Sequence, residues 1–169
     1  MSPPAATAPP ADPATATALK LWLTLMKAFQ SAADLSRMDI ARHGLTQAEF
    51  AILEALYNKG PLLLGDVQRR VLVSSGGTTF LVDRLVERGL VRRQACATDR
   101  RARYAVLTRD GIAMMRRVFP LHAQATREAM SGLTTREQKL LTDLLKRLGL
   151  AAAAKIAVNP GRREGADGG

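Results

Sequence analysis

The apolar positions that follow residue 74 have the spacing of one face of an α-helix. Ser74 and Ser75 offer hydroxyls that can accept a hydrogen bond from an unpaired backbone N–H group at the helix start. Gly89 ends the helix, because glycine takes the left-handed conformation after a helix at little cost. The pattern predicts a helix over residues 75–88, with an apolar stripe made of Phe80, Leu81, Leu85 and Val86.

Two short β-like runs follow this helix, residues 91–96 and residues 103–107, and they predict a hairpin with a basic tip. An α-helix fits the major groove of B-DNA, and the short side chains of the first turn here allow a close approach to base edges. Arginines at a hairpin tip can enter the neighbouring minor groove or lie on phosphates. The order of helix and hairpin therefore predicts recognition of a duplex. A solvated basic hairpin on an ordinary α/β domain is the alternative.

Capping boxes and apolar stripes predict further helices on both sides of this region. Thr46 with Glu49, and Thr134 with Glu137, have the spacing at which a hydroxyl and a carboxylate cap a helix start reciprocally. The run Leu62–Leu64 is long enough only for a one-bridge strand, which would be the third strand of a winged sheet. The helices are expected to run from Leu19 to about Arg42, from Thr46 to the stop at residues 58–61, from Asp66 to Leu72, from Thr108 to Met130, and from Thr134 to Ala157.

These elements predict a mainly α-helical chain with a small β wing (α+β), a winged helix-turn-helix with long N- and C-terminal dimerisation helices. The first helix and the last two carry more apolar surface than the small central domain can cover, so burial in a homodimer with twofold symmetry is expected. The densest apolar face consists of Leu140, Leu141, Leu144, Leu145 and Leu148. The expected organisation is a disordered tail at 1–17, dimerisation segments at 18–44 and 109–157, a DNA-binding domain at 45–108, and a disordered tail at 158–169.

Positive charge is concentrated around the predicted hairpin. The chain has 169 residues and a formal net charge of +10, and residues 84–117 hold ten Arg and no Lys against three acids, a net +7. A basic patch this localised favours a polyanion as the partner. Aromatic residues make up only 4% of the chain, which disfavours a stacking platform for single-stranded nucleic acid. No apolar run approaches the roughly 20 residues of a membrane span, and no signal peptide is visible, so a cytoplasmic protein is expected.

The stretch from Val82 to Gly111 resembles the MarR family of winged helix-turn-helix transcriptional regulators. The Asp-Arg-Arg hairpin tip followed by Leu-Thr-x-x-Gly is the more specific part of the resemblance. In the family the wing often carries an acidic residue three positions before Asp99, where this chain has Cys96. The resulting run is similar to a branch that includes regulators responding to quinones and other aromatic compounds. The matching residues are Val82–Val91 (VDRLVERGLV), Asp99-Arg100-Arg101, and Leu107-Thr108 with Gly111.

The resemblance implies a repressor that binds double-stranded DNA at a pseudo-palindromic operator, dimerises through its terminal helices, and is released by a small aromatic, phenolic or quinone-like effector. The family's effector pocket lies between the dimer helices and the DNA-binding lobe. Asp99 is expected to orient a wing arginine by a charge-assisted bond. The expected DNA contacts are Ser74, Ser75, Gly76, Gly77, Thr78, Thr79, Arg84, Asp99, Arg100, Arg101 and Arg103. The expected effector contacts are Trp22, Met26, Phe29, Met38, His43, Phe50 and Met114, with a core or subunit contact as the alternative for Trp22.

No combination of residues supports an enzyme, a cofactor or a metal site. The sequence has no Walker loop, no zinc pattern and no Ser/His/Asp grouping with supporting spacing. His43 and His122 are far apart, and each is interpreted as a satisfied or exposed histidine rather than a catalyst. Two alternatives to the repressor stay open. Cys96, which has several arginines close in sequence, could act as a thiol-based redox sensor, and the winged helix could serve protein contacts instead of DNA.

Overall fold

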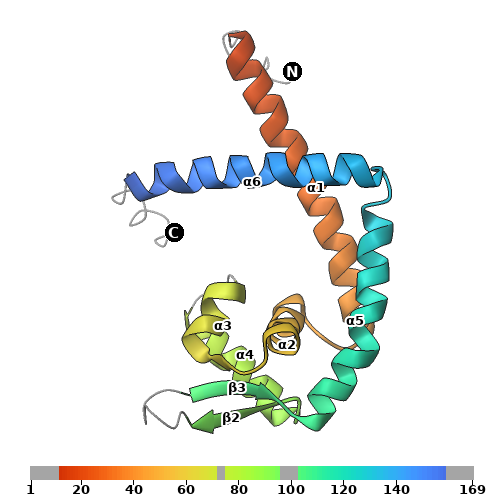
Figure 1. The fold of residues 1–169 in the computed structure, drawn as a ribbon, viewed down its shortest axis with the longest axis vertical. Helices are drawn as coiled ribbons and strands as arrows, with labels where there is room; N and C mark the ends of the chain where they lie inside the picture. The colour runs from red at the N-terminus through yellow and green to blue at the C-terminus, as the bar shows by residue number, and fades with distance from the viewer. Residues whose placement is uncertain (1–11, 72–74, 96–102, 159–169) are drawn as a thin grey trace, which may run out of the picture. The chain divides into compact units, whose positions relative to one another are not determined.

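The computed structural model describes residues 12–71, 75–95 and 103–158, and the chain divides into two units at the junction of Arg127 and Glu128. Most of these residues are helical, and the strands form one three-stranded antiparallel sheet, which confirms the predicted mainly α fold with a small β wing (Figure 1). No helix within the described ranges is long and apolar enough to cross a bilayer. The elements are α1 (Pro13–Arg42), α2 (Gln47–Lys59), β1 (Leu62–Leu63), α3 (Leu64–Val71), α4 (Ser75–Glu87), β2 (Val91–Ala95), β3 (Arg103–Leu107), α5 (Arg109–Ala129) and α6 (Thr135–Val158).

The start of α1 corrects the predicted tail. The helix begins at Pro13, so the prediction of a disordered segment through residue 17 is wrong from that residue onward. Asp12 caps the helix, because its carboxylate accepts hydrogen bonds from the backbone N–H groups of Ala14 at 3.0 Å and Thr15 at 3.1 Å. Proline is favoured at the first helical position, where a missing N–H is no loss and its fixed φ is already helical. The Asp-Pro pair is therefore a helix start signal, although the proline-rich composition around it is typical of a disordered tail.

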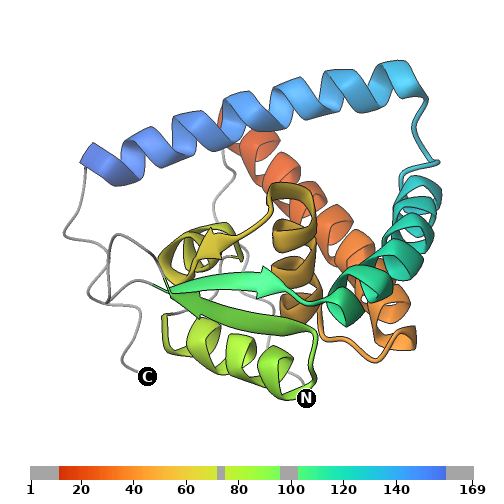
Figure 2. The ribbon, with the colours of Figure 1, turned by 60° about the horizontal axis from the view of Figure 1, so that its bottom comes forward.

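The wing sheet has the strand order β1-β3-β2, and both strand pairs are antiparallel. β2 pairs with β3 along its whole length, from Val91 opposite Leu107 to Ala95 opposite Arg103. The predicted third strand is confirmed as β1, which pairs with the other edge of β3. Figure 2 shows the sheet with α4 beside β2. The wing hairpin is thus tied through β1 to the connection between α2 and α3.

The hydrophobic core of the first unit is built around α2. Ile52 and Leu53 of this helix are completely buried, and Val67 of α3, Leu85 of α4 and Met115 of α5 are buried with them. Full burial of one such side chain contributes on the order of 1.5–3 kcal/mol. Because each of these helices places at least one fully buried residue in the same cluster, a single core fixes α2, α3, α4 and the first half of α5 relative to one another.

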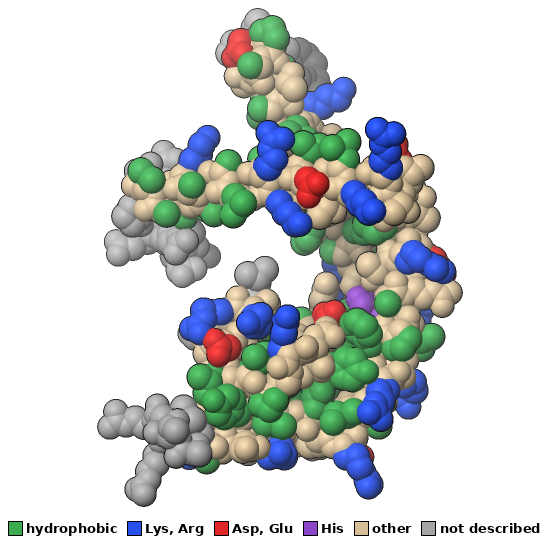
Figure 3. Space-filling model, in the orientation of Figure 1, with side chains coloured by type: hydrophobic (Ala, Val, Ile, Leu, Met, Phe, Trp, Pro, Cys, Tyr) green, Lys and Arg blue, Asp and Glu red, His purple; other side chains and the backbone are tan. Residues whose placement is uncertain are grey.

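The helix α6 begins at the predicted capping box and leaves its apolar face uncovered. Glu137 Oε2 accepts hydrogen bonds from the backbone N–H of Thr134 at 2.8 Å and from the Thr134 hydroxyl at 2.7 Å. No residue of α6 is buried. Figure 3 shows apolar side chains along this helix, interspersed with Lys and Arg. The exposed apolar residues include Leu140, Leu141, Leu144, Leu145, Leu148, Leu150 and Ile156.

Candidate nucleic-acid interface

The predicted recognition helix is α4, and it ends at the predicted glycine. Gly89 has a φ of 70°, in the left-handed region that glycine enters without a Cβ penalty. The N–H of Leu90 donates to the carbonyl of Leu85, and the N–H of Gly89 donates to the carbonyl of Val86, each at 2.9 Å. This is the Schellman arrangement, which satisfies the last carbonyls of the helix. It turns the chain from α4 into β2 at a fixed angle.

The Leu-Thr-x-x-Gly motif joins the end of α4 to the start of α5. The Thr108 hydroxyl donates to the carbonyl of Gly89 at 2.6 Å and accepts from the N–H of Gly111 at 3.0 Å. The Thr108 N–H donates to the carbonyl of Leu90 at 3.1 Å. A Cβ added at Gly111 would lie only 2.1 Å from the Leu90 carbonyl oxygen, so glycine alone fits without a shift of the backbone. The motif therefore holds together the two ends of the wing hairpin.

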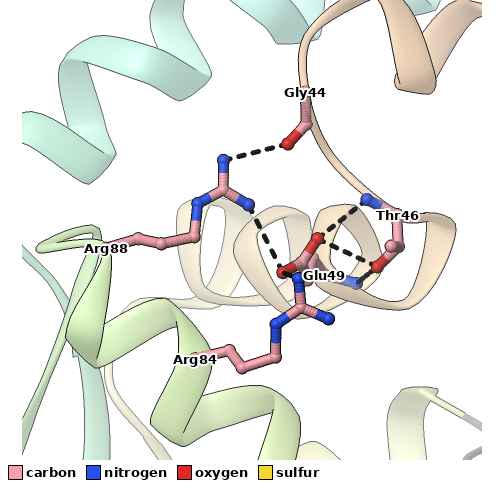
Figure 4. Close-up of polar contacts among 5 residues, drawn as sticks. All are labelled: Gly44, Thr46, Glu49, Arg84 and Arg88. Carbon is pink, nitrogen blue, oxygen red and sulfur yellow. Dashed lines mark hydrogen bonds and ion pairs between the residues drawn. The ribbon is translucent and has the colours of Figure 1, made fainter.

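A buried carboxylate connects α2 to the C-terminal half of α4 (Figure 4). Glu49 is 1% exposed, and its Oε2 closes the capping box of α2 by accepting from the Thr46 N–H at 2.8 Å and the Thr46 hydroxyl at 3.0 Å. Its Oε1 accepts from Arg88 Nη1 at 3.3 Å and lies 3.5 Å from Arg84 Nη2. Arg88 Nη2 also donates to the carbonyl of Gly44 at 2.9 Å. The sequence predicted the capping box, but it did not indicate that Arg84 and Arg88 pair with Glu49.

The surroundings of Glu49 favour its charged form. Burial of the carboxyl by itself raises the pKa, but the hydrogen bonds from Thr46 and the charges of Arg84 and Arg88 outweigh burial, so the pKa lies below its ordinary value of 4.5. A buried charge is tolerated only when it is paired and hydrogen-bonded. Both conditions are met here, so the carboxylate is ionised at neutral pH.

A second ion pair connects α4 to the wing. Arg93 Nη2 of β2 lies 2.7 Å from Asp83 Oδ1 of α4, with side chains 35% and 50% exposed. At this exposure the pair contributes only about 0–1 kcal/mol to stability. The ion pair nevertheless orients β2 relative to α4, because it joins one defined position of the strand to one of the helix. The described part of α4 is therefore held by the core, by Glu49 and by the first wing strand.

Two predictions on α4 are corrected by its orientation. Thr78 was predicted to contact DNA, but it is 2% exposed and its side chain faces the core in this structure. It lies on the same helix face as Val82 and Leu85, four and seven positions later, which are fully buried. Phe80 was predicted in the apolar stripe and is instead 60% exposed, with the Arg84 guanidinium 5.9 Å from its ring centroid. The buried face therefore runs through residues 78, 82 and 85.

The remaining predicted DNA contacts fall into three groups. Ser75 and Gly76 are in the first turn of α4, where Gly77 is half-buried and Thr79 is exposed. Arg84 is 43% exposed and paired with Glu49, and Arg103 is exposed at the start of β3. Ser74, Cys96, Asp99, Arg100 and Arg101 lie outside the described residues.

The predicted effector contacts have very different surroundings. Phe50, predicted as an effector contact, is 2% exposed and belongs to the core of the first unit. His43 is half-buried at the C-terminal cap of α1, and Met114 packs partly buried against the core. The remaining predicted contacts lie on α1 and are between 44% and 64% exposed: Trp22, Met26, Phe29 and Met38.

His122 lies where α1, α2 and α5 meet, and its ring is paired with a carboxylate. Its Nδ1 lies 3.0 Å from Asp39 Oδ2, and the two side chains are 14% and 12% exposed. Its ring centroid lies 4.5 Å from that of Phe50. This agrees with its interpretation as a satisfied side chain. The partner could not be predicted from the sequence, because Asp39 is 83 residues away.

A cavity of about 300 Å³ lies between the end of α2, β3 and the first turns of α5. Its lining includes Tyr57, Val106, Ile112 and Arg116 and contains none of the predicted effector contacts. In the described ranges no three His, Cys, Asp or Glu side chains come together as metal ligands would.

Comparison with known proteins gives a family and a closely matching relative. The model of the MarR family matches residues 43–102. The HTH-type transcriptional regulator MhqR of Bacillus subtilis (strain 168) is 40% identical over 138 residues, which are 82% of this chain and 95% of that protein.

Two solved structures share the fold. Bordetella bronchiseptica BpsR, described with the regulation of its DNA binding by 6-hydroxynicotinic acid, is 27% identical with a TM-score of 0.69, over 77% of this chain and 98% of its own. A variant of MarR from E. coli in complex with operator DNA is 25% identical with a TM-score of 0.71, over 78% of this chain and 95% of its own.

Proposed function

Because the chain belongs to the MarR family of winged helix-turn-helix transcriptional regulators, we propose that it is a homodimeric repressor that leaves its operator when a small aromatic compound binds. Its relatives and its fold are those of DNA-binding regulators rather than of enzymes. The observation that carries the proposal is the joint between α4 and the wing, where a helix with a first turn of short side chains continues through a fixed glycine turn into a hairpin. A helix so presented can enter the major groove.

In the proposed complex the start of α4 reads base edges and the wing lies on phosphates or in the minor groove. Thr79 takes the role first predicted for Thr78, because Thr79 is the exposed threonine of the pair. Arg84 contributes mainly through its ion pair with Glu49. The proposed contacts are Ser74, Ser75, Gly76, Gly77 and Thr79 at the helix start, and Asp99, Arg100, Arg101 and Arg103 in the wing.

The proposed dimer is supported by the uncovered apolar faces of the terminal helices. Eight large apolar residues of α6 are between 40% and 80% exposed in the single chain, among them Leu144 and Leu150. On α1, Trp22 and Phe29 are 58% and 64% exposed. Helix faces that expose this many large apolar side chains are typical of interaction sites. A twofold dimer buries the same faces on both copies.

The proposed effector is a small aromatic acid, phenol or quinone. Support comes from BpsR, whose DNA binding is regulated by 6-hydroxynicotinic acid, an aromatic carboxylate. The exposed aromatic and methionine side chains of α1, with His43 at its end, have the mixed apolar and polar character of a ligand site. The compound would act by favouring a dimer whose two recognition helices no longer match successive grooves.

The test of DNA binding measures affinity for two duplexes over a range of salt concentration: an operator selected with the wild-type protein from random DNA, and random DNA itself. Arg101→Ala should weaken both and lower the slope of log K against log salt by about one. Arg136→Ala, which removes one positive charge from the exposed first turn of α6, is the matched control and should change neither. Thr79→Ala should keep the slope and reduce discrimination by on the order of 1–3 kcal/mol.

Two results would contradict the proposed function. A wild-type protein without salt-dependent affinity for any duplex would favour a winged helix used for protein contacts. An unchanged operator affinity across a broad panel of aromatic acids, phenols and quinones would remove the proposed effector class while leaving the DNA-binding regulator in place.

A further inference from the structure

We propose that Glu49 is the positioning residue of the recognition helix: its buried carboxylate holds Arg84 and Arg88 and thereby sets the angle at which α4 meets DNA. The inference rests on the proposed reading of DNA by α4. It assigns to α2 a part in operator recognition, although α2 itself need not touch the duplex.

Glu49 is held rigidly at the start of α2. It is the third residue of α2, it is 1% exposed, and both hydrogen bonds from Thr46 fix its Oε2. The Glu49 N–H in turn donates to the Thr46 hydroxyl at 3.2 Å. A carboxylate held on both sides by its own capping box has little freedom to follow a moving partner. Its Oε1 is therefore a fixed acceptor facing α4.

The two arginines lie at the C-terminal end of α4, Arg84 in its last turn and Arg88 directly after it, and they are unequally held. Arg88 makes two contacts, with Glu49 at 3.3 Å and with the Gly44 carbonyl at 2.9 Å, and so joins α4 to both α2 and the turn between α1 and α2 (Figure 4). Arg84 lies 3.5 Å from Glu49 and is 43% exposed. Arg88 is the principal attachment, and Arg84 makes the longer and more exposed ion pair with the same carboxylate.

The distance from the attached end of α4 to its first turn determines how far a small tilt displaces the residues that would read DNA. α4 has 13 residues, so its first turn lies about 20 Å from the attached end. A tilt of about 10° around that end would displace the first turn by about 3 Å, which is the whole length of a hydrogen bond. Contacts with base edges are lost at such a displacement, whereas contacts of flexible cations with phosphates adapt. Loosening the attachment should therefore impair discrimination more than overall affinity for DNA.

The chain provides a matched control for this test. Glu137 forms the same capping box with Thr134 at the start of α6, with no arginine facing it among the interactions described. Glu49→Gln and Glu137→Gln both replace a capping carboxylate by an amide of similar shape. Only the first removes the counter-charge of Arg84 and Arg88.

The experiment measures the ratio of operator to random-DNA affinity and the salt slope for each variant, at a temperature where circular dichroism gives wild-type helicity. We expect Glu49→Gln to lower the ratio by about tenfold or more, the loss of one good base contact. Its salt slope should stay the same or become steeper, because two arginines are freed for phosphates. Glu137→Gln should keep the wild-type ratio and slope.

Arg88→Lys is the second variant, because lysine keeps the charge but cannot reach two acceptors with a planar fork. It should lower the ratio in the same direction as Glu49→Gln, and it decides the question if Glu49→Gln does not fold. A wild-type ratio in folded Glu49→Gln, or in Arg88→Lys when only that variant folds, would overturn the positioning role. In that case the proposed DNA-binding function would still stand on the wild-type salt-dependent affinity.

Discussion

Replacing Gly111 by alanine should destabilise the protein, because the first turn of α5 packs directly against the backbone of Leu90. An added Cβ would lie 2.1 Å from the Leu90 carbonyl oxygen, against an ordinary carbon–oxygen contact of about 3.3 Å. The two segments must therefore separate by about 1 Å. Leu90 is 8% exposed and leads into the wing, so the required shift disturbs packed backbone rather than a flexible side chain.

The size of the effect follows from three contributions. Overpacking of this kind costs about 1–3 kcal/mol. The hydrogen bond from the Thr108 N–H to the same carbonyl, 3.1 Å long, is strained or lost, which adds about 0.5–1.5 kcal/mol. The better helix propensity of alanine returns about 0.5–1 kcal/mol. The net loss in the free energy of unfolding is therefore about 0.5–4 kcal/mol.

The assay is urea unfolding at one fixed protein concentration, because the stability of a dimer depends on concentration. Gly65→Ala is the matched control, since an added Cβ there meets only the far end of the Arg69 side chain at 4.0 Å. It should be as stable as the wild type or up to about 1 kcal/mol more stable. If Gly111→Ala were as stable as Gly65→Ala, the close approach of α5 to Leu90 would be refuted.

Three other predictions follow from the same geometry. Leu144→Asp should give a monomeric mass in light scattering at micromolar concentration and lose operator binding, while the protomer stays helical because Leu144 is 46% exposed in the single chain; a retained dimer would contradict the interface. The pKa of Glu49 is below its ordinary value of 4.5, so its contribution to stability is complete above that pH and disappears as the pH falls through the lower folded value. The stability difference between wild type and Glu49→Gln in urea should accordingly be constant at neutral pH and shrink below 4.5, and a constant difference at all pH values would exclude the charge as its cause. Thr78→Ala should lower the free energy of unfolding by about 1–3 kcal/mol, because the buried side chain has a partner. The ratio of operator to random-DNA affinity should stay unchanged. A lower ratio at unchanged stability would instead indicate that Thr78 contacts a base.

Features that depend on neighbouring residues could be predicted from the sequence. The stop of α4 at Gly89, both capping boxes and the two wing strands need only a few adjacent positions, and each has the predicted place. The Leu-Thr-x-x-Gly motif could be predicted by resemblance alone, because its physical basis is the close approach of Gly111 to the Leu90 carbonyl, 21 residues earlier in the chain.

Features that depend on how each helix is rotated about its axis, and on which helices pack together, could not be predicted from the sequence. Phe80 and Thr78 exchanged their expected places, because α4 turns Val82 and Leu85 to the core and leaves the aromatic ring outside. Glu49 was recognised only as a cap, because Arg88 lies 39 residues away and nothing local indicates that α4 crosses the start of α2.

The central claim is that two copies of α4 and its wing read one operator, and chemical footprinting tests it most directly. Methylation of guanine N7 in the selected operator probes the major groove. Interference should occur in two patches related by twofold symmetry, with centres about 10–10.5 base pairs or a multiple of that apart. A single patch, two patches at another spacing, or no interference at all would contradict a homodimer that places its recognition helices in the major groove.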